Sequence, residues 1–575
     1  MEAPKPFLSE PDPHIERTPP ESVEFEEFRR LARGLVRRLG GKSAVAAGTA
    51  GLTWSSLLGT ASASSPAPVN GDYDPLLVRL VNRVCGYFEQ DEYKLALDLG
   101  YEGYLDHHLN PDAIGDQELD DYIANEPGLQ LLIDEDTTEK MLYQIDPSGT
   151  VPAQVMSNLT LLRRILSNKR LFERMVEFAD DHFSIDIKAK SLGIMKPIDD
   201  RDVIRKEALG RFFDLLKGNM YSPAMLVYLD NFQNKEPVFQ ENYARELLEL
   251  HTLGVDNGYD EDDVKDVAAC LAGLSINLDD ESPDLYKYLH VPAYHGTAQA
   301  YNILSVEPIS ITVGTAEEQA EEILVGLANH TNTKTFLAEK LVRWLLDYNT
   351  PSTLVDVAVD AYNDNDGRIS EIVRALLAQD VLQGVVNSGS LLLKRPVQHA
   401  AGLMAQINAI VRPSQSATSP GLTVLPLGSL LDEMRRAGHT PHEWGPPNGP
   451  PQAAAPWASG VDARWRVASK ILSAPQTEIC DGDTGPEPCP NELPGINVEN
   501  LALAQLLGVF EVSKTAERLS EVLTGGMLLQ NELDAIQEYV DETVEMLIDG
   551  QIEDPFIIVR ESIALTASAP SYQLY

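Results

Sequence analysis

Two histidines, His182 and His251, stand in helical sequence patterns at positions where an apolar residue would serve. On a helical wheel, His251 falls in the middle of the leucine-rich face of the run "ENYARELLELHTLG" (241–254), and His182 lies at the edge of the apolar stripe of its own helix. A buried imidazole without a hydrogen-bond partner costs about 1–3 kcal/mol. We therefore expect both rings to face inward and each to meet a polar partner.

Two interpretations of this pair remain open. In the first, each histidine is a core residue that donates to a backbone carbonyl or a carboxylate. In the second, His182, His251, Glu246 and Asp230 converge from three helices and bind a divalent metal, as in helical metalloproteins. Glu246 lies about 140° from His251 around the helix, so one helix alone cannot clamp a metal.

A second candidate region is the loop "GHTPHEWGPPNGPPQAAAPWASG" (438–460), which is long for a mere connection. Loops that carry polar and aromatic side chains often carry function. Three interpretations stay open: a metal site, an aromatic lid or carbohydrate-stacking surface, and plain packing of the loop. The binding-loop candidates are His439, His442, Glu443, Trp444 and Trp457.

Composition and motifs exclude several classes of function. The formal net charge is −43, and a surface this acidic repels phosphate, so we expect no nucleic-acid partner. The sequence contains no GxSxG, HExxH or P-loop motif in its proper context. None of the four cysteines forms a CxxC pair, which argues against a cysteine zinc site. Cys480 and Cys489 bracket a turn-rich loop and are candidates for a disulfide in an oxidising compartment.

The N-terminus resembles an export signal. A basic stretch that contains Arg37 and Arg38 precedes an uncharged, small-residue run, and "ASA" (61–63) fits a cleavage site. We expect residues 1–63 to be a twin-arginine-like leader that is removed and residues 64–73 to be a linker. The mature protein would then be periplasmic, extracellular or at the cell surface.

The elements that must position these residues are mostly helices. Apolar residues recur with a helical period from about 74 to 410, and few runs alternate with period two; "LSINLDD" and "ISITVG" are the best short-strand candidates. Asp260 and Asp263 form a capping-box pair, and Gly254 is a helix stop. We expect a mainly α fold with a multi-helix orthogonal or bundle-like core, long irregular loops and few short strands. It comprises a main helical domain (74–410), a loop-rich segment (411–500) and C-terminal helices that pack on the main domain (501–575).

Several runs follow one another in the order of a known family: "SPAMLVYLDN", "ENYARELLELHTLGVDNGYDEDDV", "TFLAEKLVRWLL", "NDGRISEIVRALL" and "KRPVQHA". From about residue 74 to the last residue, the chain resembles the bacterial exported family called domain of unknown function 1800. The resemblance implies a helical, exported protein without an established activity. Genes of that family often neighbour those of a second exported family, which resembles sulfatases and alkaline phosphatases, and this implies a paired function.

The chain also departs from the family pattern. Near Asp180, relatives often carry an aromatic-His-Asn-His run, of which only His182 remains here. The stretches "HGTAQAYN", from His295, and "LAGLS" (271–275) replace two further family motifs. If those residues bind a ligand in relatives, this protein has lost or altered it.

These features predict an exported helical protein that acts as an interaction or assembly partner of another exported protein. The alternative is a metal-dependent hydrolase or oxidoreductase that uses a cluster of histidines and carboxylates between helices. Its cofactor would be a divalent metal.

Overall fold

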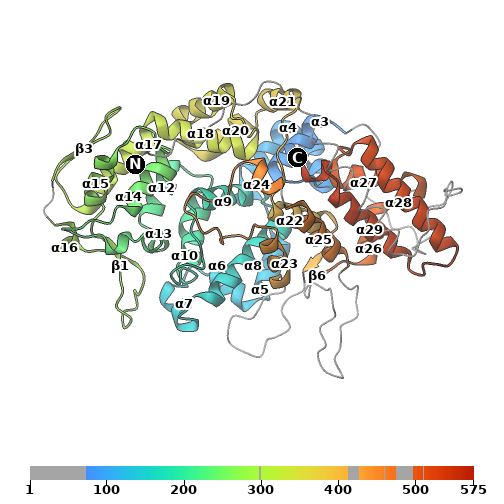
Figure 1. Ribbon diagram of the computed structural model, residues 1–575, viewed down its shortest axis with the longest axis horizontal. Coiled ribbons are helices and arrows are strands. Elements are labelled where there is room, and N and C mark those ends of the chain that lie inside the picture. Colours follow the sequence, from blue (N-terminus) through green and yellow to red (C-terminus); the bar gives the residue numbers. More distant parts are fainter. Residues whose placement is uncertain (1–72, 297–298, 412–426, 459, 474–495, 509–510) are drawn as a thin grey trace, which may run out of the picture.

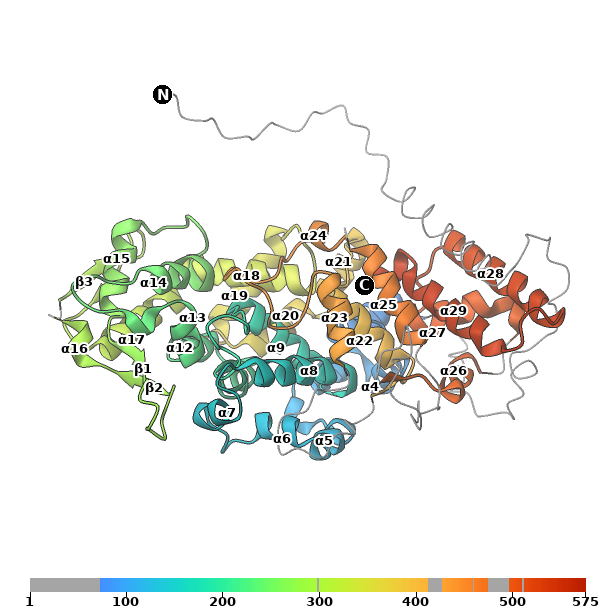
Figure 2. The ribbon, with the colours of Figure 1, turned by 60° about the horizontal axis from the view of Figure 1, so that its bottom comes forward.

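The computed structural model describes residues 73–575 except 297–298, 412–426, 459, 474–495 and 509–510. The predicted leader, nearly all of the predicted linker and the Cys480/Cys489 pair lie outside these residues. The described chain is mainly α, as the sequence predicts. Figures 1 and 2 show an elongated molecule with small hairpins at one end and the C-terminal helices at the other.

The N-terminal half of the described chain supplies the helices that surround the site. They are α3 (Pro75–Cys85), α4 (Gln90–His108), η1 (Pro111–Ala113), α5 (Gln117–Ala124), α6 (Pro127–Ile133), α7 (Glu139–Ile145), α8 (Thr150–Leu166), α9 (Arg170–His182), α10 (Lys196–Asp199), the π-helix η2 (Asp200–Ile204), α11 (Arg205–Glu207), α12 (Phe212–Met220), α13 (Pro223–Tyr228), η3 (Asn231–Gln233), α14 (Asn242–Glu246), the π-helix η4 (Leu247–Thr252) and α15 (Glu261–Cys270).

The remaining helices pack beside and beyond them. They are α16 (Pro292–His295), α17 (Ala316–Asn329), α18 (Thr331–Leu345), α19 (Ser352–Asp364), α20 (Ile369–Leu376), α21 (Gln379–Ser388), α22 (Pro396–Gln406), α23 (Gly428–Arg436), α24 (Ala454–Ala458), α25 (Val461–Leu472), α26 (Asn500–Leu507), η5 (Val512–Lys514), α27 (Thr515–Thr524), α28 (Gln530–Ile548), α29 (Pro555–Ser568) and η6 (Ser571–Gln573).

The strands form short antiparallel pairs. Each two-stranded sheet of the described chain stands alone: β1 (Leu274–Ile276) with β2 (Tyr288–His290), β3 (Tyr301–Ile303) with β4 (Ile309–Ile311), and β5 (Ile410–Val411) with β6 (Ile496–Asn497). Strands β1 and β4 lie in the two runs whose alternation predicts strands, so both predictions are confirmed.

The structure confirms the predicted signals for the start of one helix and the end of another. Asp260 caps α15 and Asp263 closes the capping box. Gly254, with a φ of 97°, follows the end of η4. The segment that carries His251 differs from the prediction, because it changes from α-helix to π-helix at Leu247.

Two hydrophobic cores share the interior. The first is built mainly by α3, α4, α9, α12 to α15 and α17 to α21. The second is built mainly by α5, α6, α8, α22, α23 and α25 to α29. Helices α8 and α9 pack against each other where the two cores meet. In the described part of the chain, no helix is both long and apolar enough to cross a membrane.

A buried arginine ties distant segments to α9. Arg174, whose side chain is fully buried, donates to the backbone carbonyls of Asn82 (3.1 Å), Arg83 (2.7 Å) and Trp344 (2.9 Å). It also donates to the hydroxyl of Tyr575 (2.8 Å). The guanidinium therefore joins α9 to α3, to α18 and to the last residue.

We predict that Arg174→Met lowers the free energy of unfolding by at least about 3 kcal/mol, because three buried carbonyls and one hydroxyl lose a charged donor. Denaturant unfolding followed by circular dichroism measures the change. The matched control is Arg466→Met, which removes an exposed ion pair with Asp462 and should cost less than about 0.5 kcal/mol. Equal losses in both variants would show that the buried network contributes nothing special.

Candidate functional site

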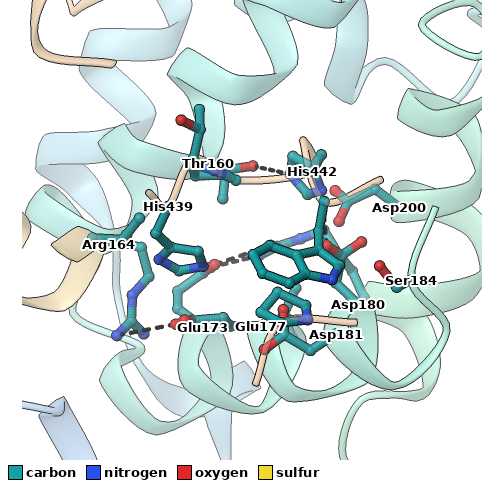
Figure 3. A pocket seen from close by; sticks show the side chains of 17 residues that line it. Thr160, Arg164, Glu173, Glu177, Asp180, Asp181, Ser184, Asp200, His439 and His442 are labelled. Carbon is teal, nitrogen blue, oxygen red and sulfur yellow. Dashed lines mark hydrogen bonds and ion pairs between the residues drawn. The ribbon is translucent and has the colours of Figure 1, made fainter. Parts of the chain in front are cut away.

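A cavity lies between α8, α9 and the loop 438–460, at the border of the two cores (Figure 3). It offers about 40 Å³ to water-sized groups. Val176 from the first core and Val397 from the second contribute to its wall. Most of the residues that line it are charged or polar, and apolar residues of both cores complete its wall.

Helix α9 supplies one wall of the cavity, because one of its faces is apolar and the other is acidic. Its apolar residues enter the first core, whereas Glu173, Glu177, Asp180 and Asp181 line the cavity. The spacings of four, three and one residues put these carboxylates on one side of the helix. A helix with this pattern normally turns its acidic face to solvent, and here the fold buries it.

Basic side chains from other segments neutralise these acids. Glu173 pairs with Arg205. Asp181 pairs with Arg395, which comes from the N-terminus of α22. Lys196, fully buried at the start of α10, lies between Asp180 (2.6 Å) and Asp199 (2.7 Å). Buried charges need such partners because an unpaired charge in the interior is strongly destabilising.

His442 joins the loop to α8 and α9 through both ring nitrogens. Its Nδ1 lies 2.9 Å from Asp180 Oδ2, and its Nε2 lies 2.8 Å from Thr160 Oγ1. An ionised carboxylate only accepts, so Nδ1 carries the hydrogen and donates to Asp180. In the neutral imidazole, Nε2 is then the acceptor, and the hydroxyl of Thr160 donates to it. The result is a hydroxyl–imidazole–carboxylate chain.

The pKa values of the two neighbouring aspartates are shifted in opposite directions. Burial alone would raise the pKa of Asp180, but His442 and Lys196 outweigh it and hold that pKa well below its usual range. Burial raises the pKa of Asp181 to about 7, and the charge of Glu177 adds to the rise against the effect of Arg395. Asp180 is therefore the fixed anion of the pair.

The backbone of the loop is strained where it meets the site. His442 has a φ of 62°, in the left-handed region that non-glycine residues rarely adopt. Gly449 has a φ of 71°, and a Cβ there would lie 2.1 Å from the carbonyl oxygen of Asp181. Such strain persists only where the surrounding structure holds it, and it is common at functional sites.

Some of the other loop candidates line the cavity, and some do not. His439 and Trp444 line the cavity with His442. The ring of Trp457 packs against that of His439 in a tilted arrangement, with ring centroids 5.1 Å apart, and its Nε1 donates to the carbonyl of Pro451 (2.9 Å). Glu443 points elsewhere and pairs with Lys188 and Arg435.

His182 and His251 lie together in a different, mostly aromatic environment. Their ring centroids are 6.3 Å apart, and only 2% and 1% of their surfaces are exposed, so the inward orientation is confirmed. The Nε2 of His182 lies 3.1 Å from the backbone carbonyl of His251, as expected for a core histidine. The expectation of a polar partner for the ring of His251 is wrong, because neither of its nitrogens has a hydrogen-bond partner within the described residues.

The two carboxylates proposed to join these histidines lie apart from them. Asp230 pairs with Lys190 (2.7 Å) and is partly exposed. Glu246 is half-buried, and its charged neighbours are Glu249 and Arg245. The described residues contain no group of three or more His, Cys, Asp or Glu side chains that could hold a metal ion. The structure therefore joins two of the four residues of the proposed cluster.

Sequence reasoning did not select Thr160, Asp180 or the acidic side of α9. The contacts of His442 with Asp180 and Thr160 span 262 and 282 residues, so no local pattern reveals them. The acidic spacing along α9 was visible, but a wheel cannot separate buried acids from solvated ones.

The unpartnered ring of His251 makes stability depend on pH. Burial, with Lys340 nearby, lowers the pKa of His251 to about 3, against about 6.5 in an unfolded chain. The unfolded state therefore binds one more proton between these values. The stability that this neutral ring contributes is complete above about pH 6.5 and is lost as the pH falls toward 3.

We predict that His251→Leu removes the extra proton that the unfolded state binds. Between about pH 5.5 and 4, the free energy of unfolding should then fall less steeply with decreasing pH, by about 1.4 kcal/mol per pH unit. At pH 7 the variant should be at least as stable as wild type, because two unsatisfied nitrogens disappear. Denaturant unfolding at stepped pH values measures both effects. Tyr243→Phe is the matched control, because it removes another buried, unpartnered polar atom that does not titrate in this range. An unchanged slope for His251→Leu would contradict the assignment.

Comparisons with known proteins agree with the resemblance seen in the sequence. The comparison with curated proteins and that with solved structures found no match. A family model described as "Protein of unknown function (DUF1800)" matches residues 79–574, which is nearly the whole chain. The chain therefore belongs to the DUF1800 family.

Proposed function

We propose that this protein is a hydrolase of small esters or amides, with Thr160 as nucleophile, His442 as general base and Asp180 as the group that orients His442. The observation that carries the proposal is the hydroxyl–imidazole–carboxylate chain inside the cavity, with contacts of 2.8 and 2.9 Å. Catalytic triads are recognised by this geometry and these roles, whatever the fold or the chain order.

The reaction would proceed in two stages. In the first, Thr160 Oγ1 attacks the carbonyl carbon while His442 takes the hydroxyl proton, and His442 then protonates the leaving alcohol or amine. In the second, His442 takes a proton from water, the hydroxide attacks the ester on Thr160, and the carboxylic acid leaves as the proton returns to Thr160. Asp180 stays ionised and stabilises the imidazolium in both stages, which its lowered pKa supports.

The cavity also offers donors for the oxygen that becomes negative in the transition state. Within the described residues, the Nε1 of Trp444 and the Nε of Arg164 have no hydrogen-bond partner, and both side chains line the cavity. Donors positioned in advance for a developing oxyanion commonly contribute about 10²- to 10³-fold in rate. These two groups are the candidates for that role.

The competing interpretation is that His442 merely fastens the loop to the helices. The position of Thr160 supports function instead, because this residue lines the cavity and is within reach of a small substrate.

The sequence supports three further proposals about this protein. The leader resemblance in residues 1–63 supports export to the periplasm, the cell surface or the medium. The family resemblance supports partnership with a second exported protein. A divalent metal at His182, His251 and Glu246 stays a prediction of the sequence.

Acyl transfer to Thr160 tests the proposal. We expect p-nitrophenyl acetate to acetylate the peptide that contains Thr160, as detected by mass spectrometry. Thr160→Val, which keeps the shape but loses the hydroxyl, should abolish this adduct. His442→Gln should slow its formation by at least about 100-fold, because the general base is lost.

Thr160→Ser is the matched control, because it keeps a hydroxyl at the same position and should still be acetylated. Circular dichroism spectra should confirm that all variants are folded. If folded wild type forms no adduct at Thr160, or if Thr160→Val turns over the ester as fast as wild type does, the proposed nucleophile is wrong.

A further inference from the structure

We propose that the cavity beside Thr160 and His442 binds the protonated amine of the substrate, with Glu177, His439 and Thr440 as its hydrogen-bond acceptors. The substrate class would therefore be small esters or amides that carry a positively charged primary amine. This inference rests on the proposed function for the reaction, but the binding of the amine can be tested independently of it.

Glu177 is a buried carboxylate that lacks donors. Neither of its oxygens has a hydrogen-bond partner within the described residues, and both are buried. The nearest cations are Arg164 at 3.5 Å and Arg395 at 3.7 Å, beyond the 2.7–2.9 Å of a charge-assisted hydrogen bond. Arg395 directs the same Nη1 to Asp181 instead. Buried polar groups are normally hydrogen-bonded, so this carboxylate lacks N–H donors that a ligand can supply.

Two further acceptors on the cavity wall lack partners. His439 is 6% exposed and its Nδ1 is unpartnered, and Thr440 is 7% exposed and its Oγ1 is unpartnered. Burial, with a contribution from Arg395, holds the pKa of His439 well below its usual range, so its ring stays neutral and keeps one acceptor nitrogen. Figure 3 shows the ring of His439 on the side of the cavity where Arg164 and the Glu173–Glu177 face of α9 lie.

The ligand that completes this site must carry N–H donors. Glu177 is the carboxylate that still lacks them, because neither of its oxygens is hydrogen-bonded within the described residues. A metal is less well matched than an amine, because no group of three or more His, Cys, Asp or Glu side chains suited to a metal is present among the described residues.

An ammonium group matches this site in size and in its number of hydrogen-bond donors. It has three N–H donors for the three acceptors, and it is small enough for a cavity of about 40 Å³. The amine would lie next to the hydroxyl of Thr160, which lines the same cavity. A compact amino ester would therefore present its carbonyl near the nucleophile.

Titration calorimetry with ethylammonium chloride tests the binding step. We expect wild type to bind this probe with a Kd of about 1 mM, near the ceiling for so small a ligand. Glu177→Gln should weaken binding at least tenfold. Thr440→Val, which leaves every ion pair intact, should weaken it several-fold and guards against a folding defect in Glu177→Gln.

Thr160→Val separates the two proposals. It should bind ethylammonium as wild type does even though it forms no acyl adduct. If folded wild type binds no ethylammonium, if Glu177→Gln and Thr440→Val bind it unchanged, or if sodium acetate or zinc chloride binds in its place, the amine site is wrong. Acetylation of Thr160 in the same preparation would leave the proposed function standing in each of these cases.

Discussion

Helix α9 carries four carboxylates into the protein interior, and the need to neutralise them determines how its neighbours are arranged. The free energy of burying these acids is unfavourable unless each finds a basic partner. The partners come from α8 and the α10–η2–α11 segment, which flank α9 in the sequence, and from the start of α22, where Arg395 lies 214 residues from Asp181. One face of one helix therefore brings together segments of both hydrophobic cores.

The candidate site is a product of the same constraint. Asp180 is held ionised by Lys196 and His442, and in turn it fixes the tautomer of His442. Lys196 is itself held by Asp199, which accepts a hydrogen bond from the hydroxyl of Ser222 (2.6 Å). The chain of contacts thus runs from the reactive hydroxyl of Thr160 to a second layer of buried polar groups, which fixes the first in position.

The sequence predicts the local features of this protein well and the site poorly. The mainly α class, the strands β1 and β4 and the capping box at Asp260 depend on neighbours within a few residues, so one sequence suffices to predict them. His251 faces inward as predicted, but its ring lacks the predicted polar partner within the described residues. It lies in a π-helix, and a wheel drawn at about 100° per residue does not describe such a segment.

The site itself depends on distant contacts and on burial. The loop 438–460 was selected for its residue types, and the structure brings His439, His442 and Trp444 to the cavity. Thr160 carries no motif, because a threonine inside a helix gives no local signal of a distant imidazole. The acidic side of α9 shows the same limit, since its role depends on bases more than a hundred residues away as well as on nearer ones.

The position of α9 between the cores also bears on how the molecule comes apart. Its apolar face belongs to the first core, whereas its charged face is paired with segments of the second. If either core opened alone, charges of the other would lose their partners inside a low-dielectric interior. The opening of either core is therefore penalised by the charges that it shares with the other, and the two cores are energetically coupled through α9.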